Sequence, residues 1–144
     1  MNLQTLQTFR LLLIASLVVG LGSGFADVVF PELLPEAFHQ TQAEHDADWE
    51  PNLSLPHVVL LGVLLVATVL SFIAGFYGLY RLRDWAPRVA LLSTVLGVVL
   101  VMSSGPMAQS PLAVATAYLS SYLWGAVLVL AHLPAYKARF QATA

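Results

Sequence analysis

Four long apolar stretches, separated by shorter polar segments, dominate the pattern of the chain. They cover residues 11–30, 56–80, 89–104 and 111–134. A membrane-spanning helix needs roughly 20 mostly apolar residues, and only a helix satisfies all of its backbone hydrogen bonds within one segment in lipid. The pattern therefore predicts an all-α membrane protein, an up-and-down bundle of four transmembrane helices that forms one domain over residues 1–144.

Residues at the ends of these stretches agree with helix boundaries. Pro56 and Pro111 fit the first turn of a helix, where the N–H that proline lacks would have no partner. Ser110 is expected to be the N-cap of the fourth helix. Because the connections between the second, third and fourth stretches are short, we expect these helices to pack as antiparallel neighbours.

The first stretch allows a second interpretation. Arg10 precedes an apolar run that ends in small residues at Ala26, a pattern that resembles a secretory signal peptide cleaved after Ala26. Cleavage would leave three helices and an amino terminus outside the cell. Retention of the first helix is the favoured prediction, with cleavage as the open alternative.

Charge is divided between the two sides of the predicted bundle. The basic residues are Arg10, Arg81, Arg83, Arg88, Lys137 and Arg139. Seven of the eight acidic residues lie from Asp27 to Glu50, in or beside the connection 31–55. Because short segments rich in Arg and Lys stay cytoplasmic, both termini are predicted to be cytoplasmic and the acidic loop extracytoplasmic. The expected location is the cell membrane, as a multi-pass protein of a bacterial inner membrane.

Composition excludes several classes of function. Only 10% of the residues are charged, against about 25% in soluble domains. A net charge of −2 with scattered basic residues argues against a nucleic-acid partner, and the absence of cysteine excludes disulfides and thiol chemistry. No catalytic motif occurs, so we expect no enzyme activity. No Asp, Glu, Lys or Arg lies in the middle of a stretch, which argues against a proton-coupled transporter.

Small residues recur every four positions in each stretch, which places them on one face of each predicted helix. Such a face lets two helix backbones approach closely in lipid. The predicted packing residues are Ser16, Gly20, Gly24, Ala67, Ser71, Gly75, Ser93, Gly97, Ala117, Ser121 and Gly125. They predict either a tight bundle or helices that dock on a partner.

Two histidines are candidate ligands for a haem or pigment. His57 and His132 lie near opposite ends of their helices, so they cannot hold one haem together. His132 also fits a plain interfacial role at a helix C-terminus. At the outer boundary, the similar depths of Asp27 and His57 allow a polar pair.

The predicted outer loop carries the remaining candidate chemistry. His39, His45 and Asp48 combine imidazole and carboxylate groups, which suit transition metals. Their spacing matches no metal-binding motif, so a solvated acidic cap is the competing interpretation. The sequence assigns no cofactor.

The favoured function is a small non-catalytic membrane protein that acts by helix packing, as an accessory subunit of a larger complex or as a homo-oligomer. Its expected partners are membrane lipids and either another membrane protein or a second copy. A passive channel or uncoupled carrier of small solutes is the alternative, because hydroxyl groups crowd the middle of the fourth stretch. A haem- or pigment-binding subunit is a further alternative.

Overall fold

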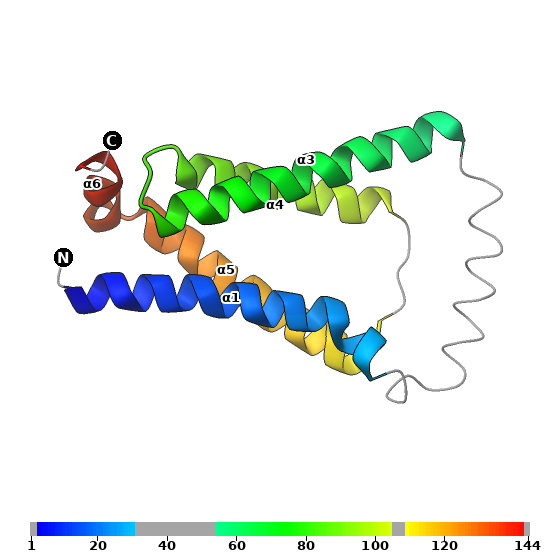
Figure 1. The fold of residues 1–144 in the computed structure, drawn as a ribbon, viewed down its shortest axis with the longest axis horizontal. Coiled ribbons are helices and arrows are strands. Elements are labelled where there is room, and N and C mark those ends of the chain that lie inside the picture. Colours follow the sequence, from blue (N-terminus) through cyan, green and yellow to red (C-terminus); the bar gives the residue numbers. More distant parts are fainter. Residues whose placement is uncertain (1–2, 31–53, 105–108, 143–144) are drawn as a thin grey trace.

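The protein is described here by a computed structural model that covers residues 3–30, 54–104 and 109–142. Regular secondary structure in these ranges is entirely helical. The helices are α1 (Leu3–Val29), α3 (Leu55–Tyr80), α4 (Ala86–Ser103), α5 (Pro111–His132) and α6 (Pro134–Ala142) (Figure 1). Helices α1, α3, α4 and α5 are each long and apolar enough to cross a membrane. The prediction of an all-helical fold with four candidate membrane-spanning helices is therefore confirmed.

The four long helices form two antiparallel pairs. Helix α1 packs along α5, and α3 packs along α4, whereas contacts between the two pairs are few. Figure 1 shows the pairs meeting at the end that carries both termini and diverging toward the other end. We call these the basic end and the open end, because the turn between α3 and α4 lies at the end that carries the termini (Figure 1). Arg81 and Arg83 belong to this turn, and Arg88 follows in the first turn of α4. The expected neighbours α3 and α4 do pack together, but the main partner of α5 is α1 rather than α4.

Small side chains allow the close approach of α1 and α5. Ser16 is 4% exposed, and a Cβ atom added to Gly20 would lie 2.8 Å from the Oγ atom of Ser120. The Ser120 hydroxyl donates a hydrogen bond of 2.9 Å to the carbonyl oxygen of Ser16. This contact joins the middles of the two helices, and a larger side chain at Gly20 would displace it.

Glycine also sets the distance between α3 and α4. A Cβ atom at Gly75 would lie 3.0 Å from the Cα atom of Ala90, and one at Gly78 would lie 2.7 Å from the Cβ atom of Ala86. Both glycines are buried. Close backbone contact of this kind is how helices associate where lipid surrounds them, because dispersion contacts then provide most of the attraction.

The turn between α3 and α4 ends the first of these helices with a Schellman motif. The N–H of Leu82 donates to the carbonyl oxygen of Leu79 at 3.2 Å, and the N–H of Arg83 donates to that of Gly78 at 2.8 Å. Leu82 has a φ of 56°, in the left-handed region that usually favours glycine. Its side chain is buried in the core, which offsets the backbone strain and explains a leucine at this position.

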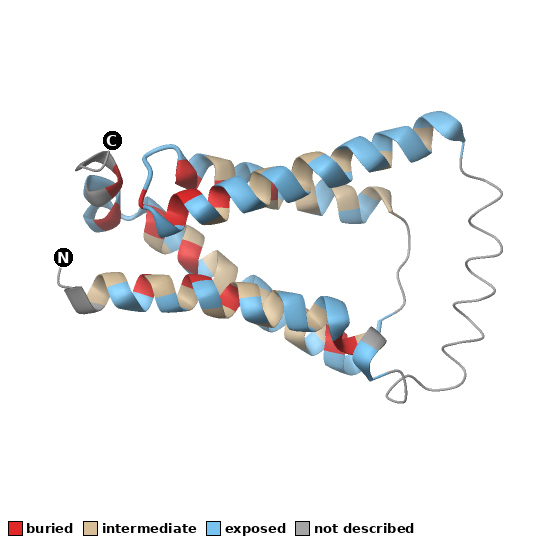
Figure 2. Ribbon diagram, viewed as in Figure 1, coloured by how far each residue is buried: buried red, intermediate tan, exposed pale blue. Residues whose placement is uncertain are grey.

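The largest cluster of buried residues joins both pairs at the basic end (Figure 2). Phe9 is at its centre, with ring centroids 5.4 Å from Tyr136 and 6.3 Å from Phe140. The cluster comprises Phe9, Leu13, Leu79, Leu82, Ala86, Ala90, Val127, Ala131, Tyr136 and Phe140. Every described helix contributes to it, so this cluster holds the two pairs together.

Two parts of this cluster were not predicted from the sequence. Helix α1 begins at Leu3, eight positions before the predicted start, because Phe9 needs a helical register to reach the cluster. The chain after α5 forms α6, which Pro134 begins and which turns Tyr136 and Phe140 inward. Tyr136 is 7% exposed and belongs to this cluster.

We predict that Gly75→Leu destabilises the α3–α4 pair by about 1–3 kcal/mol, because the neighbouring Ala90 atoms are backbone and cannot move aside. Gly62→Leu in the same helix is the matched control, since no described atom lies within 4 Å of its added Cβ. Thermal unfolding of both variants in detergent checks the difference. Equal melting temperatures would contradict the assigned helix interface.

Candidate functional site

The predicted packing residues fall into two groups in the structure. Those at contacts within the chain are Ser16, Gly20, Gly75, Ser93 and Gly97. The others are half-buried or exposed: Gly24, Ala67, Ser71, Ala117, Ser121 and Gly125. A Cβ atom added to Gly24 or Gly125 would meet no described atom within 4 Å. The second group leaves small residues on the outer surface of α5, available to another molecule.

Most serine and threonine hydroxyls along the long helices are satisfied within their own helix. Each donates to a carbonyl oxygen three or four residues earlier, at 2.7–3.0 Å. The residues are Ser16, Ser23, Thr68, Ser71, Ser93, Thr94, Thr116 and Ser121. These groups therefore need no partner from outside the protein.

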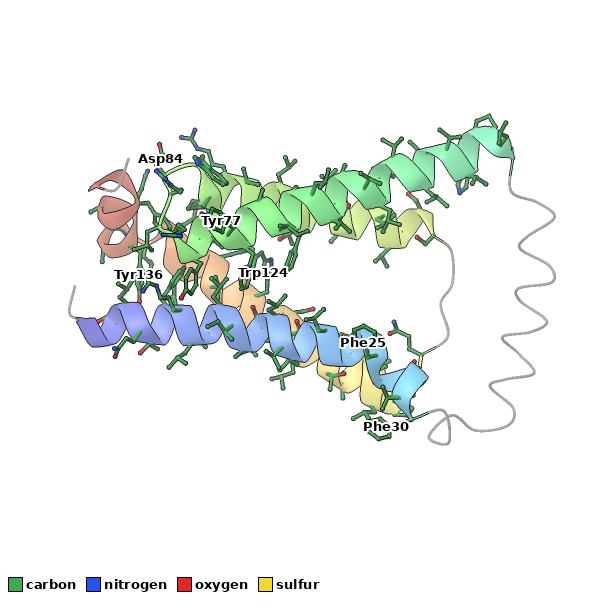
Figure 3. The ribbon with its side chains drawn as sticks, in the orientation of Figure 1. Phe25, Phe30, Tyr77, Asp84, Trp124 and Tyr136 are labelled. Atoms are coloured by element: carbon green, nitrogen blue, oxygen red, sulfur yellow. The ribbon has the colours of Figure 1, made fainter. Side chains whose placement is uncertain are left out.

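Trp124 connects the two helix pairs halfway along the molecule. Its Nε1 atom donates a hydrogen bond of 2.9 Å to Oγ1 of Thr94 on α4, and its ring centroid lies 5.3 Å from that of Phe72 on α3. Figure 3 shows Trp124 in this position between the pairs. The sequence indicated a polar face on α5, but it did not identify Phe72 or Thr94 as its neighbours.

Two tyrosines on α5 have no such partner. Tyr118 is 61% exposed and Tyr122 is 74% exposed, and neither hydroxyl forms a hydrogen bond to any residue that the structure describes. Positions 118, 122, 125 and 129 follow helical spacing, so Gly125 and the exposed Val129 lie on the same face. We call Tyr118, Ser121, Tyr122, Gly125 and Val129 the α5 outer face.

A groove runs between α1 and α3 at the basic end. Its lining residues are Ile14, Leu17, Phe72, Ile73, Phe76, Tyr77 and Tyr80, and its volume is about 410 Å³. A second cavity of about 230 Å³ continues from it, shares Leu17 and Phe72, and reaches Ser120 and Trp124 on α5. The two cavities together lie between the helix pairs along α1 from Ile14 to Leu21.

At the open end, Asp27 of α1 binds the start of α5. Its carboxylate accepts hydrogen bonds from the backbone N–H of Ser110 at 3.2 Å and from the Ser110 hydroxyl. Ser110 in turn accepts from the N–H of Ala113 at 3.2 Å, which confirms its predicted role as N-cap. A carboxylate here also suits the partial positive charge of a helix N-terminus.

The two candidate histidines, His57 and His132, have different surroundings in the structure. His57 does not pair with Asp27: its Nε2 atom is buried without a hydrogen-bond partner, while the carboxylate is bonded to Ser110. His132 lies at the opposite end of the molecule, where its Nδ1 atom is 2.8 Å from the carbonyl oxygen of Leu128. It also lines a cavity of about 240 Å³ with Asp84 and Arg88.

The proposed metal ligands His39, His45 and Asp48 lie outside the residues that the structure describes. Within the described ranges, no group of three or more His, Asp or Glu side chains is placed to hold a metal ion. Neither histidine in those ranges therefore lies in a ready-made ligand set.

No family model, curated protein or solved structure matches this chain. Its function must therefore be argued from its own residues and geometry.

We predict that Asp27→Ala lowers the free energy of unfolding by about 1–2 kcal/mol, because it removes the acceptor for both Ser110 donors. Ser110→Ala should have a similar effect, since it also removes the cap of α5. The double variant should lower the free energy of unfolding by clearly less than the sum of the losses in the two single variants. Thermal unfolding in detergent checks this, and fully additive losses would show that the two residues act separately.

Proposed function

We propose that this protein is a non-catalytic multi-pass membrane protein that acts by packing a helix face against another membrane protein or a second copy of itself. Its four long helices would cross the membrane, with the basic end and both termini in the cytoplasm. The segment 81–88, which carries three arginines, joins α3 to α4 at the end of the bundle that carries the termini, and it supports this orientation because short basic segments remain cytoplasmic.

The observation that carries this proposal is the unpartnered Tyr122 hydroxyl. Tyr122 lies in the middle of the 22-residue helix α5. Half the thickness of the hydrocarbon core is roughly 15 Å, farther than a tyrosine side chain extends. A hydroxyl without a partner in an apolar environment costs roughly 1–3 kcal/mol. A partner molecule on the α5 outer face would remove this cost.

The shape of the same face suits another helix. Gly125 leaves open space beside the two tyrosine rings, since no described atom lies within 4 Å of its added Cβ. A small residue flanked by large side chains lets a second backbone approach closely and receive hydrogen bonds from the tyrosines. The partner would therefore be a transmembrane helix with an accessible carbonyl, hydroxyl or amide group facing Tyr122.

The geometry gives less support to a channel. The serine and threonine hydroxyls in the middle of α5 are bonded within the protein: Thr116 and Ser121 to their own helix, and Ser120 to Ser16. The groove between α1 and α3 is lined almost wholly by apolar and aromatic side chains. We therefore favour the packing function over solute passage.

The first test places a photoreactive amino acid at position 122 and cross-links it in native membranes. We expect a discrete protein adduct from this position, either to another membrane protein or to a second copy. The same group at Leu92, which is exposed on α4, should give mainly lipid adducts. Lipid adducts alone from position 122 would overturn the proposal.

We further predict that Gly125→Leu reduces the yield of that protein adduct about tenfold, because overpacking at a helix interface costs roughly 1–3 kcal/mol. The protein itself should remain folded, since no described neighbour meets the new side chain. Gly62→Leu, made in equally open space on α3, is the matched control and should leave the yield unchanged. An equal loss in both variants would indicate a general effect on insertion instead.

A further inference from the structure

The groove between α1 and α3 has a cationic mouth at the basic end. Arg10 lies one turn before Ile14 on α1, and its guanidinium carbon is 5.0 Å from the centroid of the Tyr80 ring, which lines the groove. Arg81 lies 5.6 Å from the centroid of Tyr77, another lining residue. Two arginines are therefore held on aromatic rings at one end of an apolar cavity.

Neither arginine has an acidic partner in the described part of the chain. The Nε atom of Arg10 is buried and forms no hydrogen bond. The one acidic residue described at the basic end, Asp84, accepts a hydrogen bond of 2.8 Å from the backbone N–H of Trp85. Cation–π contacts orient a guanidinium but leave its charge and its N–H donors free to bind an anion.

The length of the cavity together with its cationic mouth matches one leaflet of a bilayer. The groove and its continuation are lined on α1 from Ile14 to Leu21, which at 1.5 Å per residue is about 10 Å. Arg10 lies one turn before Ile14, so the distance along α1 from this arginine to the far end of the cavity is about 16 Å. Half of the hydrocarbon core is roughly 15 Å thick. A transmembrane helix would need a surface about twice as long, whereas a single acyl chain that starts at the headgroup level fits this length.

We propose that this groove binds one anionic phospholipid, with its phosphate between Arg10 and Arg81 and one acyl chain along Leu17, Phe72 and Ile73. Basic residues between helices on the cytoplasmic side are suited to acidic headgroups, and arginine binds phosphate with two N–H groups at once. The lipid would fill the space between the helix pairs where protein contacts are few. This site rests on the proposed membrane insertion and orientation, but not on the α5 outer face.

The test measures lipid retention by native mass spectrometry of the purified full-length protein. Phosphatidylglycerol and phosphatidylcholine with identical acyl chains are supplied in equal amounts. We expect one phosphatidylglycerol to be retained in preference to phosphatidylcholine. Soluble glycerol phosphate should not displace it, because it lacks the acyl chain that fills the groove.

Matched variants separate the headgroup site from general surface charge. Arg10→Gln and Arg81→Gln should each reduce phosphatidylglycerol retention on the order of fivefold, the effect expected for one arginine near an anionic headgroup. Arg83→Gln is the control, because this arginine is exposed in the same turn and contacts no aromatic ring among the described residues. An equal reduction in all three variants, or no preference for the anionic lipid, would overturn the proposal.

A second pair of variants tests the acyl chain. Ile73→Trp places a bulky side chain in the groove and should abolish retention while both arginines remain. Leu92→Trp, on the exposed surface of α4, should have no effect. Retention of phosphatidylglycerol by Ile73→Trp would show that the lipid does not bind in the groove. A photoreactive cross-linker at position 73 that captures protein rather than lipid would show that the occupant of the groove is a helix. Loss of the α5 partner alone would leave all of these results unchanged.

Discussion

For the four long helices to cross a membrane as proposed, each of their polar groups must find its hydrogen-bond partner within protein. The serine and threonine hydroxyls meet this requirement locally, by donating to carbonyl oxygens one turn earlier in their own helix. Three hydrogen-bonded contacts between helices provide such partners: Ser120 with Ser16, Trp124 with Thr94, and Asp27 with Ser110. Tyr118 and Tyr122 have no such partner among the described residues, and the proposed partner surface lies where these two hydroxyls are exposed.

The distribution of contacts divides the molecule into a firmly packed end and a loosely packed one. Phe9, Tyr136 and the residues around them join all of the described helices at the basic end (Figure 2). Toward the open end, contacts within the α1–α5 pair continue to Ala26 and Ser110, whereas the N-terminal half of α3 is largely exposed. Because the pairs share so few contacts there, their separation depends on what surrounds them.

This arrangement gives two proposed interactions with separate physical origins. The groove between α1 and α3 exists because the pairs diverge from the basic end, and its arginines add a charge that the described chain does not neutralise. The α5 outer face exists because α5 packs on α1 with its opposite side, through Ser120. A lipid in the groove would fix the distance between the pairs, while a helix on α5 would add protein contacts outside them.

The sequence by itself determined the number of long helices, their approximate limits and the capping of α5 by Ser110. These features follow from local properties: the length of apolar stretches, the missing N–H of proline and the preference of serine for helix N-termini. The separation of basic from acidic segments was also determined by the sequence, because the positions of charged residues along the chain do not depend on tertiary contacts. The small-residue spacing indicated packing faces, but it gave no partner for any of them.

Only the tertiary structure decided which helices pair. The four-residue spacing is nearly the same in every helix, so it could not reveal that α5 packs on α1 while α4 packs on α3. Asp27 bonds to Ser110, 83 positions later, rather than to His57, because the α1–α5 pairing brings that helix start beside it. The groove and its Arg10–Tyr80 mouth join residues 70 positions apart in the chain. Such contacts depend on the relative placement of whole helices, which no local pattern of residues specifies.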